Sequence, residues 1–329
     1  MSEDSDRIRE DIEKEIFQLE TRLQNARNRL NEVKEAPVEG AFLPLSYTNG
    51  ISCYAVDLYL MRSSGTDMFF IHEESNPLLS LHSLLLLSDS ALPLGSFAYS
   101  SGLESFIAHH KPLPPSTTLV ASFRRFLKLS ITSMASTSLP YLLSAHRHPE
   151  QLATLDNDLD ASTPCTVARR ASVAQGRALL GVWERAFRTI HVRNDRSHDD
   201  YTKSAIQALG NFSEALKFHT ADADELGANG HFAPLWGVIC LAMGVNLSLT
   251  AYVFLVNHTK TILSAAVRAS VMGPYQAQSI LASDDVQHLI NERIQREWMV
   301  DPEYAGQVAP VLDLWVGRHD LLYSRIFNS

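Results

Sequence analysis

A run of alternating acids is the first group of side chains in this sequence that could bind a metal ion. Asp156, Asp158 and Asp160 are spaced like the first ligands of a calcium-binding loop. Such a loop also needs glycine at its sixth position and glutamate at its twelfth, where this chain has Ala161 and Val167. We therefore interpret the aspartates as members of an exposed acidic loop that binds no calcium.

Two pairs of histidines are the other candidates for metal chemistry. His109 adjoins His110, and His146 lies two residues before His148. Imidazole nitrogen is a common ligand for borderline metals. Adjacent residues on a helix point about 100° apart, however, so His109 and His110 would rarely chelate one ion by themselves. The sequence predicts surface histidines and no metal site.

The spacings that define common enzyme classes are missing from the sequence. None of the 15 glycines is followed by lysine, so the Gly-Lys core of a phosphate-binding P-loop cannot form. The chain also lacks HExxH, GxSxG, GxGxxG and SxxK patterns, which serve zinc hydrolysis, acyl transfer and dinucleotide binding. These absences argue against an enzyme and predict that the chain is not itself a GTPase.

Composition and charge narrow the partners and the compartment. The 37 acidic residues exceed the 28 basic ones, and the net charge of −9 disfavours nucleic acid as a partner. Cys53, Cys165 and Cys240 are scattered without CxxC spacing, which indicates a reducing compartment. The first ten residues, MSEDSDRIRE, are too charged for a secretory signal, so we expect a cytoplasmic protein.

One apolar stretch has the length of a membrane span. It runs from Trp236 to Val256, but the polar residues Asn246, Ser248 and Thr250 interrupt it. Polar groups that face lipid are costly, so a buried core helix is the better interpretation. The sequence therefore predicts no contact with a membrane.

The secondary-structure pattern divides the sequence into three regions. In residues 1–36, apolar residues are spaced alternately four and three apart, which predicts a short coiled-coil helix. Pro37 ends that pattern. Residues 37–76 are mixed in character, and we interpret them as a linker without an assigned structure. Residues 77–329 read as one helical domain.

Helical patterns with capping residues and breakers account for nearly all of residues 77–329. We expect a first helix that ends at Ser88, and a second that Ser116 caps and that reaches Ala145. Strand signals are almost absent from this region, so the predicted fold class is all-α, a single helical bundle. The other expected helices cover residues 165–190, 202–219, 232–243, 246–271 and 273–298, with a short one from about residue 309, and either Asn246 or Ser248 is expected to cap the helix that ends near residue 271.

Three separated blocks of this region resemble the UreF family of urease accessory proteins. The first is LLLLSDSALPLGSFAYSSGLE, residues 84–104, and the second lies within residues 235–281 and includes LAMG and GPYQAQSIL. The third is HDLLYSRIFNS, residues 319–329. They occur in the family's order, so the resemblance covers about three quarters of the chain and leaves the coiled coil outside it.

The resemblance implies an all-helical, non-catalytic adaptor that forms a homodimer. It implies binding to a UreD-type (also called UreH-type) accessory protein and, through that pair, to the nickel-carrying UreG-type GTPase, so that the assembly acts on apo-urease. The function implied is support of GTP-dependent nickel insertion, with no stably bound cofactor in this chain, because nickel is handled by the assembled complex.

The same resemblance and the character of the side chains give candidate site residues. Aromatic residues and arginines usually dominate the binding energy of protein interfaces. Pro93, Gly95 and Gly102 are expected to shape the turn of the first block. The predicted partner-binding residues are Tyr99, Ser100, Glu104, His319, Tyr323, Ser324, Arg325 and Phe327.

Two alternatives from other classes stay open at this point. One is a helical coiled-coil interaction protein unrelated to urease, and the other is a metal-dependent helical enzyme that uses a histidine cluster. An enzyme would hold metal at near-stoichiometric occupancy and turn over alone, whereas an adaptor would co-purify with its partner.

Overall fold

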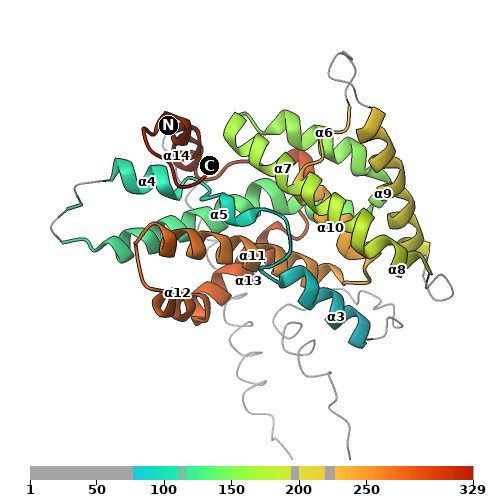
Figure 1. The fold of residues 1–329 in the computed structure, drawn as a ribbon, viewed down its shortest axis with the longest axis horizontal. Coiled ribbons are helices and arrows are strands. Elements are labelled where there is room, and N and C mark those ends of the chain that lie inside the picture. The colour runs from blue at the N-terminus through green and yellow to red at the C-terminus, as the bar shows by residue number, and fades with distance from the viewer. Residues whose placement is uncertain (1–76, 111–112, 115, 194–199, 219–226, 329) are drawn as a thin grey trace, which may run out of the picture. The chain divides into compact units, whose positions relative to one another are not determined.

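A computed structural model describes residues 77–110, 113–114, 116–193, 200–218 and 227–328 (Figure 1). The predicted coiled coil of residues 1–36 and the linker of residues 37–76 lie outside these residues, so both stay predictions. The larger described elements, in chain order, are α3 (Pro77–Ser88), α4 (Leu103–His109), α5 (Leu119–Arg147), α6 (Leu152–Ser162), α7 (Thr166–Val182), α8 (Arg188–Arg193), α9 (Asp200–Phe218), α10 (Phe232–Ala242), α11 (Leu247–Arg268), α12 (Pro274–Leu281), α13 (Asp284–Glu297) and α14 (Val311–Arg318).

Helix α10 lies at the centre of the domain. It contacts α5, α6, α7, α9 and α11, and all but two of its eleven residues are buried. A helix that is apolar all round can be stable in this way only when other helices cover every face. Gly237 allows α5 to approach, because a Cβ atom at that position would lie 2.4 Å from the carbonyl oxygen of Leu142.

The two longest helices, α5 and α11, pack on each other and begin at side-chain caps. The Thr118 hydroxyl accepts the backbone N–H of Ala121, and the Asn246 side chain accepts that of Leu249. Such caps satisfy amides that the first helical turn leaves without partners. The predicted cap Ser116 is therefore wrong by two residues for α5, and of the two expected caps for α11, Asn246 or Ser248, the structure has Asn246.

The all-α prediction is confirmed for the part of the chain that the structure describes, where every regular element is helical. Two boundaries are corrected. The acidic stretch predicted as a loop lies in helix α6 up to Ser162, because Asp156 and Asp160 fall on one helical face that contacts other helices. The helix expected over residues 273–298 is two helices, α12 and α13, separated at Ala282 and Ser283.

The apolar stretch from Trp236 to Val256 is interior structure. It divides between α10 and α11 at the turn that contains Gly244, whose φ of 73° is left-handed. Among the described helices, none is long and apolar enough to cross a bilayer.

A π-helical turn joins α7 to α8. It spans Trp183–Phe187, and the backbone N–H of Arg188 donates to the carbonyl oxygen of Trp183, five residues earlier. The predicted single helix over residues 165–190 is therefore close in extent, but it carries one inserted residue that shifts the face of everything after it.

Candidate functional site

The first and last motif blocks meet where α4 packs against α14, which lie side by side in Figure 1. Phe106 of α4 and Trp315 of α14 pack edge to face, with ring centroids 4.7 Å apart. Gly102 has a φ of 85° and lies so close to α14 that a Cβ atom would contact the Val316 side chain at 3.0 Å. This turn needs glycine for both its backbone angle and its close approach.

Glu104, in the first turn of α4, joins the two blocks by hydrogen bonds. Its carboxylate accepts the backbone N–H of Ile326 at 2.7 Å and that of Phe327 at 3.2 Å. His319 Nε2 lies 3.0 Å from the same carboxylate and donates to it. The His319 side chain has no exposed surface and that of Glu104 is 13% exposed, so the bond between them is shielded from water, whereas the bond from Ile326 lies at the surface.

Two further contacts hold residues 319–328, here called the 319–328 segment. Phe327 is only 4% exposed, and the guanidinium carbon of Arg268 lies 4.6 Å from the centre of its ring. The backbone N–H of Asn328 donates to the carbonyl oxygen of Ala98 at 2.7 Å. The segment is thus fixed at its buried residues to α4, α11 and the turn before α4.

Between its anchors the 319–328 segment presents large side chains to solvent. Tyr323 is fully exposed, Leu321 is 80% exposed and Ile326 is 64% exposed. Phe97, one residue from the Ala98 contact, is 69% exposed. Apolar and aromatic groups held on a fixed backbone are the kind of surface that protein partners bind.

Asp320 connects the segment to α7. It accepts Arg325 Nη1 at 2.9 Å and Arg170 Nη2 at 3.3 Å, and all three side chains are well exposed. Exposed ion pairs of this kind contribute little to stability. Their effect is to hold the Arg325 guanidinium against Asp320 without burying it.

The structure therefore sorts the predicted partner-binding residues into two groups. Ser100, His319 and Phe327 are buried and the Glu104 side chain is only 13% exposed, so these four residues support the surface. Ser100 Oγ also accepts the backbone N–H of Glu104 at 3.3 Å. Pro93 and Gly95 lie in the preceding turn, and Gly95 has a φ of 69°. The residues with exposed or partly exposed side chains are Tyr99, Tyr323, Ser324 and Arg325.

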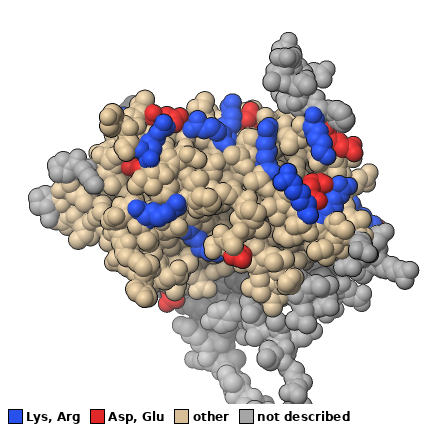
Figure 2. Space-filling model, in the orientation of Figure 1, with Lys and Arg blue, Asp and Glu red and all other residues tan. Residues whose placement is uncertain are grey.

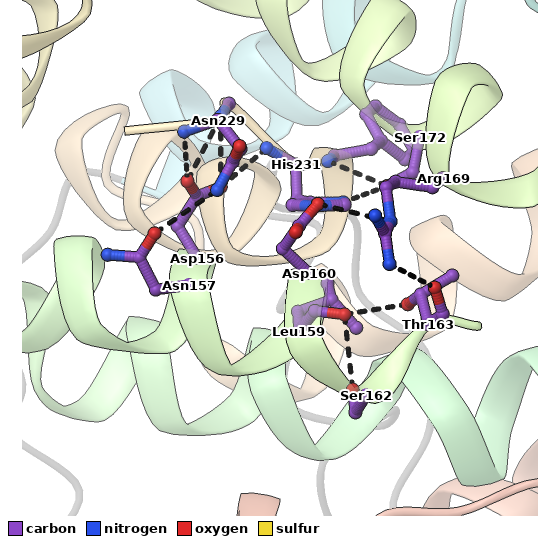
Figure 3. A network of polar contacts seen from close by, with 12 residues as sticks. Asp156, Asn157, Leu159, Asp160, Ser162, Thr163, Arg169, Ser172, Asn229 and His231 are labelled. Carbon is purple, nitrogen blue, oxygen red and sulfur yellow. Dashed lines mark hydrogen bonds and ion pairs between the residues drawn. The ribbon is translucent and has the colours of Figure 1, made fainter. Parts of the chain in front are cut away.

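A second polar network fixes the chain around residue 230 (Figure 3). Asp156 is fully buried, and its carboxylate accepts three consecutive backbone N–H groups. They belong to Asn229 at 2.6 Å, Gly230 at 3.0 Å and His231 at 2.6 Å. A buried carboxylate is tolerated when several N–H donors satisfy it in this way. Asp156 therefore ties the start of α10 to α6.

A serine, a histidine and an aspartate beside this network contact one another in the order of a catalytic triad. The aspartate is Asp160, which lies one helical turn beyond Asp156. Ser172 Oγ is 3.0 Å from His231 Nδ1, and His231 Nε2 is 3.1 Å from Asp160 (Figure 3). Acyl transfer also requires N–H donors aimed at an open reacting position. Here the backbone N–H of Phe232 donates to Ser172 Oγ itself, and His231 has no exposed surface. The arrangement is suited to fixing α7 against α10.

Sequence reasoning missed both networks. Asp156 and Asp160 are four residues apart, a spacing that is typical of one helical face. The alternation of the three aspartates instead led to the prediction of an exposed loop. The ion pairs of Asp320 have a weaker signal in the sequence, which is the position of this acid between His319 and Arg325 in the same motif block. No sequence pattern indicates that Glu104 accepts hydrogen bonds from backbone N–H groups, because the donors are amides more than 220 residues away.

The groups considered for metal chemistry have other uses in the described residues. His109 Nδ1 contacts the carbonyl oxygen of Ser105 at 2.7 Å, and burial raises the pKa of the Cys240 thiol, which keeps it protonated. His146 Nε2 donates to the carbonyl oxygen of Val245 at 2.9 Å. Within the described ranges, no three His, Cys, Asp or Glu residues are grouped to hold an ion.

Fold and surface together define an all-helical domain that holds one short segment in place and presents its exposed side chains. Comparison with known proteins gives the same assignment, since the family model UreF matches residues 118–283. The chain belongs to the UreF family of urease accessory proteins.

Similar proteins occur in fungi and plants. A Schizosaccharomyces pombe protein described as an uncharacterized UreF-like urease accessory protein is 36% identical over 248 residues, which are 75% of this chain and 97% of that protein. Urease accessory protein F of rice (Oryza sativa subsp. indica) is 30% identical over 75% of this chain and 85% of its own length. Urease accessory protein 6 of Cryptococcus neoformans is 26% identical over 76% of this chain and 97% of its own length.

Proposed function

We propose that this chain is a non-catalytic adaptor in urease maturation. It binds a UreD-type (UreH-type) accessory protein and, with it, a UreG-type GTPase, and the assembly supports GTP-dependent nickel insertion into apo-urease. Nickel is cargo of the assembled complex, and this chain holds no cofactor of its own. The chain works as a homodimer in the cytoplasm and contacts neither nucleic acid nor membrane.

The observation that carries the proposal is the anchored 319–328 segment. Glu104 and His319 stand 215 residues apart in the sequence, yet they meet and hold the segment from its buried side. Tyr323 and Arg325 then face solvent on a backbone that is already ordered. Ordering the surface before binding lowers the entropic cost of association, which suits a docking site.

In this proposal the buried and exposed residues have separate tasks. Glu104, His319 and Phe327 position the segment, whereas Tyr323 and Arg325 contact the UreD-type partner. Loss of an interfacial tyrosine or arginine typically costs about 1 to 3 kcal/mol of binding free energy. Deleting the whole segment would remove buried His319 and Phe327 as well, so point variants are the sharper test.

The test is a quantitative pull-down of the UreD-type protein by the full-length chain and by the double variant Tyr323→Ala/Arg325→Ala. A matched control carries Tyr275→Ala/Arg296→Ala, since both of these residues are also exposed and lie on α12 and α13. We expect the first variant to lose capture while its circular dichroism stays that of the wild type, and the control to bind normally. Equal capture by all three proteins would contradict the proposal.

The adaptor assignment also predicts that the isolated chain binds no GTP, because its sequence lacks the Gly-Lys loop that cradles phosphates. Isothermal titration with GTP and Mg²⁺ measures this directly. Micromolar binding to the isolated chain would refute the adaptor assignment and favour an enzyme.

A further inference from the structure

One run of helix carries positive charge in a chain that is acidic overall. From Thr166 to Arg193 the sequence has six arginines and a single acid, Glu184, a balance of +5 within a chain of −9. No lysine occurs in this run. Figure 2 shows basic side chains gathered across the region where Figure 1 places α7, with few acidic ones among them.

The π-helical turn brings these arginines onto one face. Arg170 and Arg177 are seven residues apart, which leaves them within about 20° around an α-helix. Arg185 follows Arg177 by eight residues and would be turned by about 80° on a regular helix, but it lies within the π-helical turn Trp183–Phe187, whose wider winding reduces this offset. Arg170, Arg177 and Arg185 therefore lie on one side of the helix, and Arg188 follows at its margin.

These four residues, here called the arginine row, are all exposed. Arg188 is paired with Glu184 at 2.7 Å, and Arg170 shares Asp320 with the 319–328 segment. Arg177 donates through Nε to the carbonyl oxygen of Asn229, and among the described residues neither Arg177 nor Arg185 has an ion-pair partner. Among the described residues, the positive charge along the row therefore exceeds the negative charge of the acids that face it.

The length and the neighbours of the row match a protein interface. Eighteen residues of helix span about 27 Å, close to the width of a patch of about 800 Å² that each partner contributes to a standard interface. The row begins at Asp320, inside the surface proposed above to bind a partner. At its far end, Ile190 is 60% exposed and Val192 is 42% exposed, which adds apolar area beside the charge.

We propose that the arginine row docks an acidic protein surface, one carried by an accessory partner of the same complex. Arginine binds carboxylates through two parallel hydrogen bonds, a geometry that lysine does not offer. A long polyanion or an anionic bilayer would be repelled by the net charge of −9, whereas a compact acidic patch meets only the local positive field. The inference rests on the adaptor function and deepens it by giving the charge of the docking partner.

The experiment uses the full-length chain with the charge-reversing variant Arg177→Glu/Arg185→Glu, which leaves Arg170, Asp320 and the 319–328 segment unchanged. A milder variant, Arg177→Gln/Arg185→Gln, removes the charges if the reversal disturbs folding. The control is Arg124→Glu/Arg125→Glu, two exposed arginines of α5 with the same change in charge. Circular dichroism checks that each variant is folded.

Binding to the co-expressed UreD-type and UreG-type proteins is measured at several NaCl concentrations. We expect the reversal to raise the dissociation constant of the assembly at least tenfold and the neutral variant to raise it less. We also expect both to flatten its dependence on salt, while the control matches the wild type. Equal affinity of wild type and reversal variant would overturn the inference and leave the adaptor function standing. Capture of neither protein by the wild type would overturn both.

Two further probes test whether the arginine row binds anionic partners other than an acidic protein. A fluorescein-labelled DNA duplex and vesicles containing phosphatidylserine are offered to the wild type and to the reversal variant. We expect neither to bind. Binding of the duplex or the vesicles that the reversal abolishes would overturn the assignment to an acidic protein and indicate a phosphate-bearing partner instead.

Discussion

Replacing Glu104 by glutamine tests whether one carboxylate holds the 319–328 segment in place. The substitution keeps the size of the side chain and removes its charge. It also turns one of the two oxygens into an NH₂ group, which can donate but cannot accept. Because Oε1 accepts Ile326 N–H and Oε2 accepts both Phe327 N–H and His319 Nε2, either orientation of the amide leaves at least one donor facing another donor.

The magnitude follows from the number and kind of bonds affected. A hydrogen bond to a charged group contributes about 1.5 to 3 kcal/mol, and a neutral one about 0.5 to 1.5 kcal/mol. One or two of the three bonds are lost and the rest become neutral, so the segment should be less stably attached by about 2 to 4 kcal/mol. Since about 1.4 kcal/mol corresponds to a factor of ten, detachment becomes about 30- to 700-fold more frequent.

Amide hydrogen exchange of Ile326 and Phe327 reports this opening, because their N–H groups are the donors. We expect faster exchange at these two amides and unchanged exchange in the core helix α10. Glu303→Gln, at an exposed glutamate in the 3₁₀ turn Pro302–Tyr304, is the matched control with the same change in charge. Unaltered protection of Ile326 and Phe327 in the Glu104→Gln variant would show that the carboxylate does not hold the segment.

Three further predictions concern the rest of the domain. Asp156→Asn should lower the free energy of unfolding by about 2 to 4 kcal/mol, measured by urea denaturation, because an amide cannot accept all three backbone N–H groups. Gly237→Ala should cost about 1 to 3 kcal/mol or prevent folding, since its methyl group would overlap the Leu142 carbonyl; an unchanged melting temperature would contradict this close packing. Burial lowers the pKa of the His258 imidazole to about 4 and lowers that of His146 from its ordinary 6.5. The free energy of unfolding should therefore be highest above about pH 6.5 and fall as the pH drops toward 4. Urea midpoints at pH 7 and pH 5 measure this loss, and His258→Gln should reduce the difference between them.

Helix positions were predictable because each has a local cause. The 3.6-residue spacing of apolar side chains, a cap such as Asn246 and a breaker such as Gly244 act within a few residues of the chain. Where the prediction was wrong, longer-range packing decided the outcome. Asp156 lies in a helix, not a loop, because its charge is satisfied by amides 73 to 75 residues away, which no local pattern contains.

The candidate site was predictable only as a set of residues, without their roles. Motif blocks identified Glu104 and His319, but the sequence could not show that the first binds the backbone beside Phe327 and that the second is fully buried. The sequence also did not show that Arg177 and Arg185 lie on one side of the helix. That arrangement depends on a π-helical turn, whereas the regular helical period separates the two by about 80°.

The position of Glu104 links the folding of the domain to the formation of the surface that we propose binds a partner. The exposed surface of the 319–328 segment exists only when α4, which carries Glu104, has packed against α14, which leads into His319. A partner that binds this surface therefore binds the folded chain in preference to the unfolded one, and it stabilises the fold in proportion to its affinity. An adaptor constructed in this way would recruit its partners only after its own domain is complete.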